Sequence, residues 1–118
     1  MPTVFSADQA ANESGTYAIT VSFTDEDGAA VVPNSPLTWS LTKADRVTIV
    51  NSRVNVSITP ASSITIVLTG DDLAKDAGQL ISWRYLVIEG TYNSTLGNDL
   101  PLKDHLRFPI VDIAKVPD

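Results

Sequence analysis

Cysteine is absent from this 118-residue chain, and histidine occurs only once. The missing cysteines exclude a buried disulfide, thiolate metal sites and cysteine catalysis. Basic residues are also few, because 8 Lys and Arg stand against 14 Asp and Glu, which gives a net charge of −6. Such a surface repels phosphate backbones, so we expect no nucleic-acid partner.

Long hydrophobic runs are missing as well. No apolar run approaches the ~20 residues that span a bilayer, so we expect no membrane partner. Residues 1–15 contain no Lys or Arg and no apolar core, which argues against a signal peptide and predicts synthesis in the cytoplasm. Residues 1–16 are small and polar, so we expect an N-terminal arm followed by a single domain over residues 17–118.

Alternation of apolar and polar residues is what the chain has in abundance. It runs through Tyr17–Phe23, Leu37–Leu41, Ile64–Leu68 and Leu106–Ile110. A period of two is typical of strands with one buried face, and clusters of Gly, Asp, Asn and Pro between the stretches indicate turns. The pattern predicts an all-β domain, an immunoglobulin-like β-sandwich of seven to eight antiparallel strands, with a jelly roll as the alternative.

Finer features follow from the same pattern. We expect Trp39 in the centre of the core, because sandwiches often place a large aromatic side chain there. Val47 and Ile49 predict a short strand, and Leu73–Gly78 predicts one helical turn. The most apolar stretch, Leu80–Tyr92, predicts a strand that is central or lies at an interface.

The sequence offers little for catalysis or metal binding. His105 follows Asp104, but neighbouring strand residues point to opposite faces, and no G-x-S-x-G elbow accompanies them. Acidic turns at Asp25–Gly28 and Asp71–Asp72 offer oxygen atoms to Ca²⁺, but they lack the spacing of a calcium loop. We therefore expect a protein that is not an enzyme and that has no cofactor or metal.

Exposed aromatic side chains are the remaining candidate site. Trp83 and Tyr85 share one face of the apolar strand, and Arg84 and Tyr92 belong to the same strand. Aromatic residues and Arg are enriched at protein interfaces, so these four residues form a candidate interface unless the rings fold into the core. An exposed apolar strand around Leu86–Ile88 would also favour self-association through sheet edges.

Two segments carry a family resemblance, TWSLTKADRVTIVNSRVNVSITPASSITIVLTGDDL and RYLVIEGTYNSTLGNDLPLKDHLRFPIVDI. The chain from Trp39 to Ile113 resembles the immunoglobulin-like structural proteins of tailed bacteriophages, the small accessory or decoration-type proteins of head or tail. The resemblance implies a non-enzymatic virion component, made in the host bacterial cytoplasm, that docks on capsid or tail proteins. It implies no catalytic or ligand-binding residues. An immunoglobulin-like module that binds glycans or cell surfaces is the alternative function.

Overall fold

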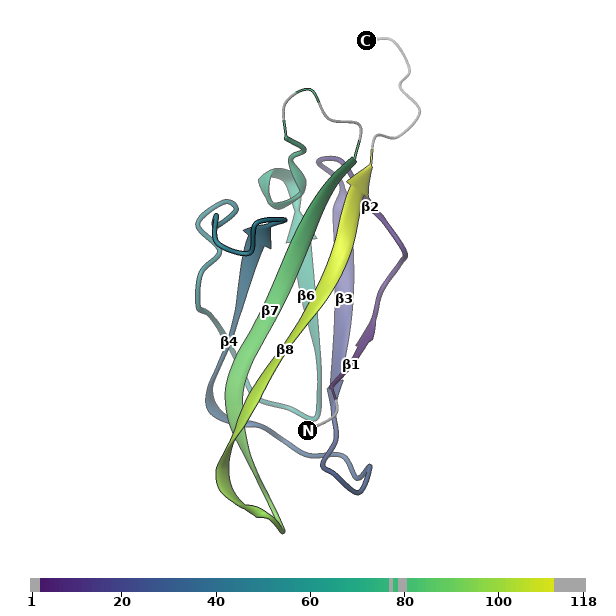
Figure 1. Cartoon of the computed structure of the whole chain (residues 1–118). Helices are drawn as coiled ribbons and strands as arrows, with labels where there is room; N and C mark the ends of the chain where they lie inside the picture. The colour runs from purple at the N-terminus through teal and green to yellow at the C-terminus, as the bar shows by residue number, and fades with distance from the viewer. Residues whose placement is uncertain (1–2, 77, 79–80, 112–118) are drawn as a thin grey trace.

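The computed structural model of this chain describes residues 3–76, 78 and 81–111, and these residues form two β-sheets, one behind the other (Figure 1). Within them, the three-stranded sheet has the order β1-β3-β6 and the five-stranded sheet the order β2-β8-β7-β4-β5. The bounds of the three-stranded sheet are β1 Thr3–Ser6, β3 Thr16–Phe23 and β6 Ser63–Thr69. The bounds of the five-stranded sheet are β2 Ala11–Asn12, β4 Asn34–Lys43, β5 Val56–Ile58, β7 Ile81–Ser94 and β8 Gly97–Val111. The prediction of an all-β protein is confirmed.

The hydrophobic core lies between the sheets and follows the alternation in the sequence. In β3, for example, Tyr17, Ile19, Val21 and Phe23 are buried, while the residues between them are exposed or half-buried. Burying one large apolar side chain in this way stabilises the fold by roughly 1.5–3 kcal/mol. Trp39 is 7% exposed and belongs to this core, as its place in the sequence predicted.

β7 is a central strand, as the apolar stretch predicted. It lies between β4 and β8, and its register places Ile88 beside Trp39 and Leu86 beside Leu106. Leu86 and Ile88 face the core and have no exposed surface. In the described sheet, the segment Leu86–Ile88 is buried and has no free edge, so the exposed strand that would favour self-association is not present there.

Gly90 of β7 is needed where β4 and β7 approach each other closely. The register between the strands shifts between Asn34 and Thr38. A Cβ atom on Gly90 would lie 2.9 Å from Leu37 Cδ1 and 3.4 Å from the Pro36 carbonyl oxygen. Glycine therefore permits the irregular stretch of β4 to lie against β7.

Residues 3–6 and 11–12 form strands of the two sheets, in the segment where the sequence predicted an N-terminal arm over residues 1–16. β1 pairs antiparallel with β3, and β2 pairs in parallel with β8, with Ala11 opposite Ile110. Ala11 is 1% exposed and is part of the core. Short edge strands are hard to predict from small, polar residues, because strand pairing uses backbone groups that every residue carries and so leaves no pattern in the side chains. Residues 1–2 lie outside the described residues.

The helical turn lies earlier than predicted. It is a short 3₁₀ helix, η1 (Gly70–Leu73), whereas the sequence pattern placed a turn at Leu73–Gly78. Asp72 explains the shift, because its carboxylate accepts a hydrogen bond from the Thr69 backbone N–H at 3.2 Å and so closes the first turn.

Candidate functional site

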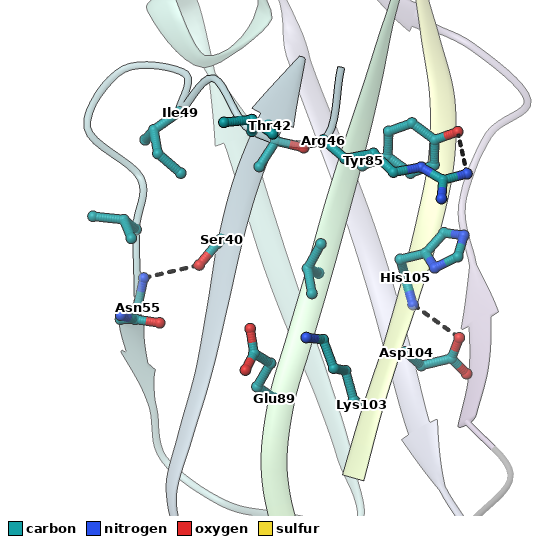
Figure 2. A pocket seen from close by; sticks show the side chains of 13 residues that line it. Ser40, Thr42, Arg46, Ile49, Asn55, Tyr85, Glu89, Lys103, Asp104 and His105 are labelled. Carbon is teal, nitrogen blue, oxygen red and sulfur yellow. Dashed lines mark hydrogen bonds between the residues drawn. The ribbon is translucent and has the colours of Figure 1, made fainter. Parts of the chain in front are cut away.

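A groove lies on the outer face of the five-stranded sheet, beside the loop of residues 44–55 (Figure 2). Alternation along the strands builds its floor, because odd-numbered residues of β7 and β8 face away from the core. In the sheet register, Tyr85 lies beside Thr42, and Val87 lies between Ser40 and His105. The groove has a volume of about 710 Å³ and is lined by Ser40, Thr42, Arg46, Val47, Ile49, Val54, Asn55, Tyr85, Val87, Glu89, Lys103, Asp104 and His105.

The hydroxyl groups in the floor already have partners within the protein. Ser40 is 9% exposed, and its Oγ accepts a hydrogen bond from the Asn55 backbone N–H at 2.9 Å. Thr42 is 5% exposed and donates from Oγ1 to the Lys43 carbonyl oxygen at 3.2 Å. The Ser40–Asn55 contact ties the loop to β4, and the Thr42 contact stays within that strand.

The loop begins with a tight turn around Asp45. Its carboxylate accepts the backbone N–H groups of Val47 and Thr48, both at 2.8 Å. Hydrogen bonds from the Thr48 side chain and from these two amides lower the pKa of Asp45 to about 2. Ile49 then forms an isolated bridge to Thr42, so the short strand predicted at Val47 and Ile49 is a single bridge. The Asp45 carboxylate accepts the Val47 and Thr48 amides in a turn, and this turn competes with the formation of a longer strand at residues 47–49.

A buried carboxylate holds the far end of the loop. Asp72 is 1% exposed and accepts hydrogen bonds from Arg53 Nε at 2.8 Å and from Asn51 Nδ2 at 2.9 Å. Burial raises the pKa of Asp72, but the hydrogen bonds from Arg53, Asn51 and the Thr69 amide outweigh it and hold that pKa below its ordinary value. The ion pair thus connects the groove wall to η1.

Tyr85 is the centre of a cluster of cationic and aromatic side chains in the groove. The Arg46 guanidinium carbon lies 4.8 Å from the Tyr85 ring centroid, and Arg46 Nη2 donates to the Tyr85 hydroxyl at 3.3 Å (Figure 2). The His105 ring also meets Tyr85 edge-on, with centroids 5.3 Å apart. Arg46 has a φ of 64°, a left-handed conformation that a non-glycine residue keeps only where contacts hold it.

Trp83 lies on the same outer face and is 36% exposed. The Arg107 guanidinium carbon lies 3.7 Å from its ring centroid, which is a close cation–π contact. Arg46, Lys103 and Arg107 thus place three positive charges on this face, beside the carboxylates of Glu89 and Asp104.

The candidate interface from sequence divides between the two faces of β7. Trp83 and Tyr85 share the outer face, as predicted. Arg84 and Tyr92 are 1% and 5% exposed and face the core, so these two residues do not lie on an exposed surface, as the sequence had predicted they would. The reason is the period of two, because even-numbered residues of β7 point inward with Leu86.

Arg84 has a structural environment. Its Nη2 lies 3.1 Å from Asp76 Oδ1 and 3.0 Å from the Ala74 carbonyl oxygen, and its Nη1 donates to the Trp83 carbonyl oxygen at 2.9 Å. Burial raises the pKa of Asp76, but hydrogen bonds from Arg84 and Lys43 outweigh it and lower that pKa. Among the described residues, Arg84 Nε has no hydrogen-bond partner. Arg84 therefore anchors the chain after η1 to the core face of β7.

The other groups considered from sequence take part in local structure. Asp104 Oδ1 accepts the backbone N–H of His105 at 2.8 Å. Asp25 Oδ1 accepts the N–H groups of Asp27 and Ala29, both at 2.9 Å, which makes an acidic turn. In the part of the chain that the structure describes, no group of three His, Cys, Asp or Glu residues is placed to hold a metal ion.

Sequence analysis did not single out the loop, Arg46 or the hydroxyl floor as parts of the site. One signal was present: Lys103, His105 and Arg107 alternate along β8 and so share a face. The contribution of Arg46 had no local signal, because it depends on how the loop folds back over β4 toward Tyr85.

Comparisons of the chain with protein-family models, with curated proteins and with solved structures find no match. None of the helices in the described residues is long and apolar enough to cross a membrane. Function is therefore inferred from the geometry of the groove and from the resemblance in the sequence.

Proposed function

We propose that this protein is a non-enzymatic structural or accessory component of a tailed-phage particle. It docks on a capsid or tail protein through the groove on the outer face of β4, β7 and β8. The cluster of Arg46, Tyr85 and His105 carries the proposal, because Tyr and Arg dominate the binding energy of protein interfaces. The phage setting, with synthesis in the host cytoplasm, rests on the sequence resemblance.

The groove is suited to receive a side chain or short segment of a partner. Its volume of about 710 Å³ lies within the range of ligand-binding sites. Val47, Ile49 and Val54 on its wall are 77%, 37% and 51% exposed, so a partner that covers them removes apolar surface from water. Because Asp72 fixes the loop beforehand, little ordering entropy is lost on binding.

We also propose that the sandwich is of the immunoglobulin-like type. In such sandwiches the A, B and E strands share one sheet and the C, F and G strands the other. Here β1, β3 and β6 take the first set of places, and β4, β7 and β8 the second. The change of sheet between β3 and β4 and the hairpin of β7 and β8 support this assignment.

A glycan ligand is the alternative that the experiments must separate from a protein partner. Sugar rings stack on open aromatic faces, and Trp83 is the exposed aromatic residue on this side of the sheet. Arg107 already covers one face of its ring. A glycan array with the wild-type protein and with Trp83→Ala distinguishes the two, because specific glycan binding that is lost in Trp83→Ala contradicts protein docking.

The direct test uses the particle of the phage or prophage that encodes this chain. We expect the protein as a stoichiometric band in purified particles, and we expect added protein to rebind particles that have been stripped of it. No band in the particles, together with no rebinding, would contradict the proposed function.

A further inference from the structure

We propose a second binding surface, which adjoins the groove through Lys103, Asp104 and His105 of β8. The open edge of β8 between Pro101 and Pro109 accepts an acidic, extended segment of a partner protein as an added strand of the five-stranded sheet. β8 is 15 residues long, but β2 pairs only with its residues Ile110 and Val111. Among the described residues, no strand pairs with residues 97–109 on the side away from β7.

The two prolines show which backbone groups point outward. Pro101 lies opposite Thr91 and Pro109 opposite Trp83 in the pairing with β7. Proline has no N–H, so these odd-numbered positions are the ones that do not exchange hydrogen bonds with β7. The odd-numbered residues between them therefore direct their N–H and C=O groups toward the open edge, and these residues are Lys103, His105 and Arg107.

Two hydrogen bonds agree with this direction. The Val111 carbonyl, at the end of the same odd-numbered series, accepts the N–H of Glu13 at 3.0 Å. At the middle of the edge, Asp104 Oδ1 accepts the outward N–H of His105 at 2.8 Å (Figure 2). A carboxylate of the protein itself thus occupies the position that the carbonyl oxygen of an added strand would take. Asp104 is half-buried, so it can turn into water when that strand arrives.

Charge identifies the occupant. Lys103, His105 and Arg107 are exposed on the outer face of the edge. Glu89 of β7 lies opposite Lys103, and the basic side chains of Lys103 and Arg107 still outnumber it, so the residues facing them on an added strand should be acidic. A second copy of this chain is a poor occupant. Antiparallel pairing of two β8 edges centred on His105 places Lys103 opposite Arg107, and like charges directly opposite each other destabilise a sheet.

The inner face of β8 determines which residues of the added strand should be apolar. Leu106 is half-buried and packs against the core from the edge strand. An added strand would place an apolar side chain over it, so the recognised segment alternates acidic and apolar residues. The prolines at both ends limit the added ladder to the residues between them, which argues against open-ended stacking of copies.

The test uses the full chain and the blocked peptide acetyl-TEVEVET-amide, with acetyl-TKVKVKT-amide as its matched control. NMR with hydrogen exchange follows the backbone amides of Lys103 and Arg107. We expect the glutamate peptide to slow exchange at both amides and to bind at least about tenfold more tightly than the lysine peptide. No protection by the glutamate peptide at millimolar concentration, or equal binding of both peptides, overturns the proposal.

Charge reversal provides the second arm. The double variant Lys103→Glu/Arg107→Glu should prefer the lysine peptide. If the double variant does not fold, the milder Arg107→Gln replaces it in the test, and it should bind the glutamate peptide more weakly than wild type does. Arg46→Glu lies in the groove, against Tyr85, and should change peptide binding far less than the β8 variants do. A loss in Arg46→Glu with none in the β8 variants assigns the peptide to the groove and overturns the edge site. Failure of particle docking, by contrast, leaves peptide protection at the edge as a separate result.

Discussion

Arg46 lies across the ring of Tyr85, with its guanidinium carbon 4.8 Å from the ring centroid and its Nη2 within 3.3 Å of the hydroxyl. The contact joins the loop of residues 44–55, which connects β4 to β5, to β7. Tyr85 is 8% exposed as a result, and its ring forms part of the groove instead of a free surface. The groove therefore depends on the loop as much as on the sheet.

Removing that contact should loosen the loop. Arg46→Ala loses a cation–π contact and a hydrogen bond at a partly exposed site, so we expect the free energy of unfolding to fall by about 1 kcal/mol. Amide exchange over residues 44–49 should become faster. Arg107→Ala is the matched control, because it removes the contact with Trp83 and leaves the loop in place. Unchanged loop exchange in Arg46→Ala would contradict the role of this pair.

Asp72→Asn tests the anchor at the other end of the loop. The variant weakens the hydrogen bonds that Asn51, Arg53 and the Thr69 amide donate to a buried carboxylate. We therefore expect the free energy of unfolding, measured by urea denaturation, to fall by about 2 kcal/mol. Asp71 is exposed in the same helix, and Asp71→Asn should stay within about 0.5 kcal/mol of wild type. Equal effects of the two variants would show that Asp72 does not hold the loop.

The lowered pKa values predict how stability depends on pH. Asp72 and Asp76 have folded pKa values below their ordinary value, and that of Asp45 is about 2. The unfolded chain binds protons first as pH falls, so this stabilisation is complete above about pH 5 and is lost as pH falls through the folded pKa values. Urea denaturation from pH 7 to pH 2 should show this loss. The loss should be smaller in Asp72→Asn, and an identical pH profile would contradict the assignment.

Two substitutions of Arg84 distinguish the contribution of its packing from the contribution of its charge to the stability of the fold. Arg84→Met keeps most of the buried volume and leaves Asp76 with Lys43, whereas Arg84→Ala also opens a cavity. We expect losses of about 1 kcal/mol for Arg84→Met and about 3 kcal/mol for Arg84→Ala, measured by chemical denaturation. A larger loss in Arg84→Met than in Arg84→Ala would contradict a mainly packing role.

Much of the fold was predictable because alternation reports directly on burial. The period of two identified the buried faces of β3 and β6, and the unbroken apolar run identified β7 as a central strand. β1 and β2 were missed because they are short edge strands whose pairing leaves little trace in side-chain pattern.

The candidate site was predictable only in part. The period of two placed Trp83 and Tyr85 on one face of the strand. The same period places Arg84 and Tyr92 on the other face, where both are buried. What sequence did not supply was the approach of Arg46 to Tyr85. That contact arises from a turn, a bridge and a buried ion pair acting together on one loop.

The central claim is that the groove docks on the particle. Val47 on the groove wall and Val67 on the outer face of β6 are 77% and 53% exposed, so Val47→Glu and Val67→Glu place the same charge on two different surfaces. The measurement is the affinity of each variant for stripped particles. We predict a loss of about tenfold or more for Val47→Glu and wild-type affinity for Val67→Glu. Wild-type affinity of Val47→Glu would contradict the account.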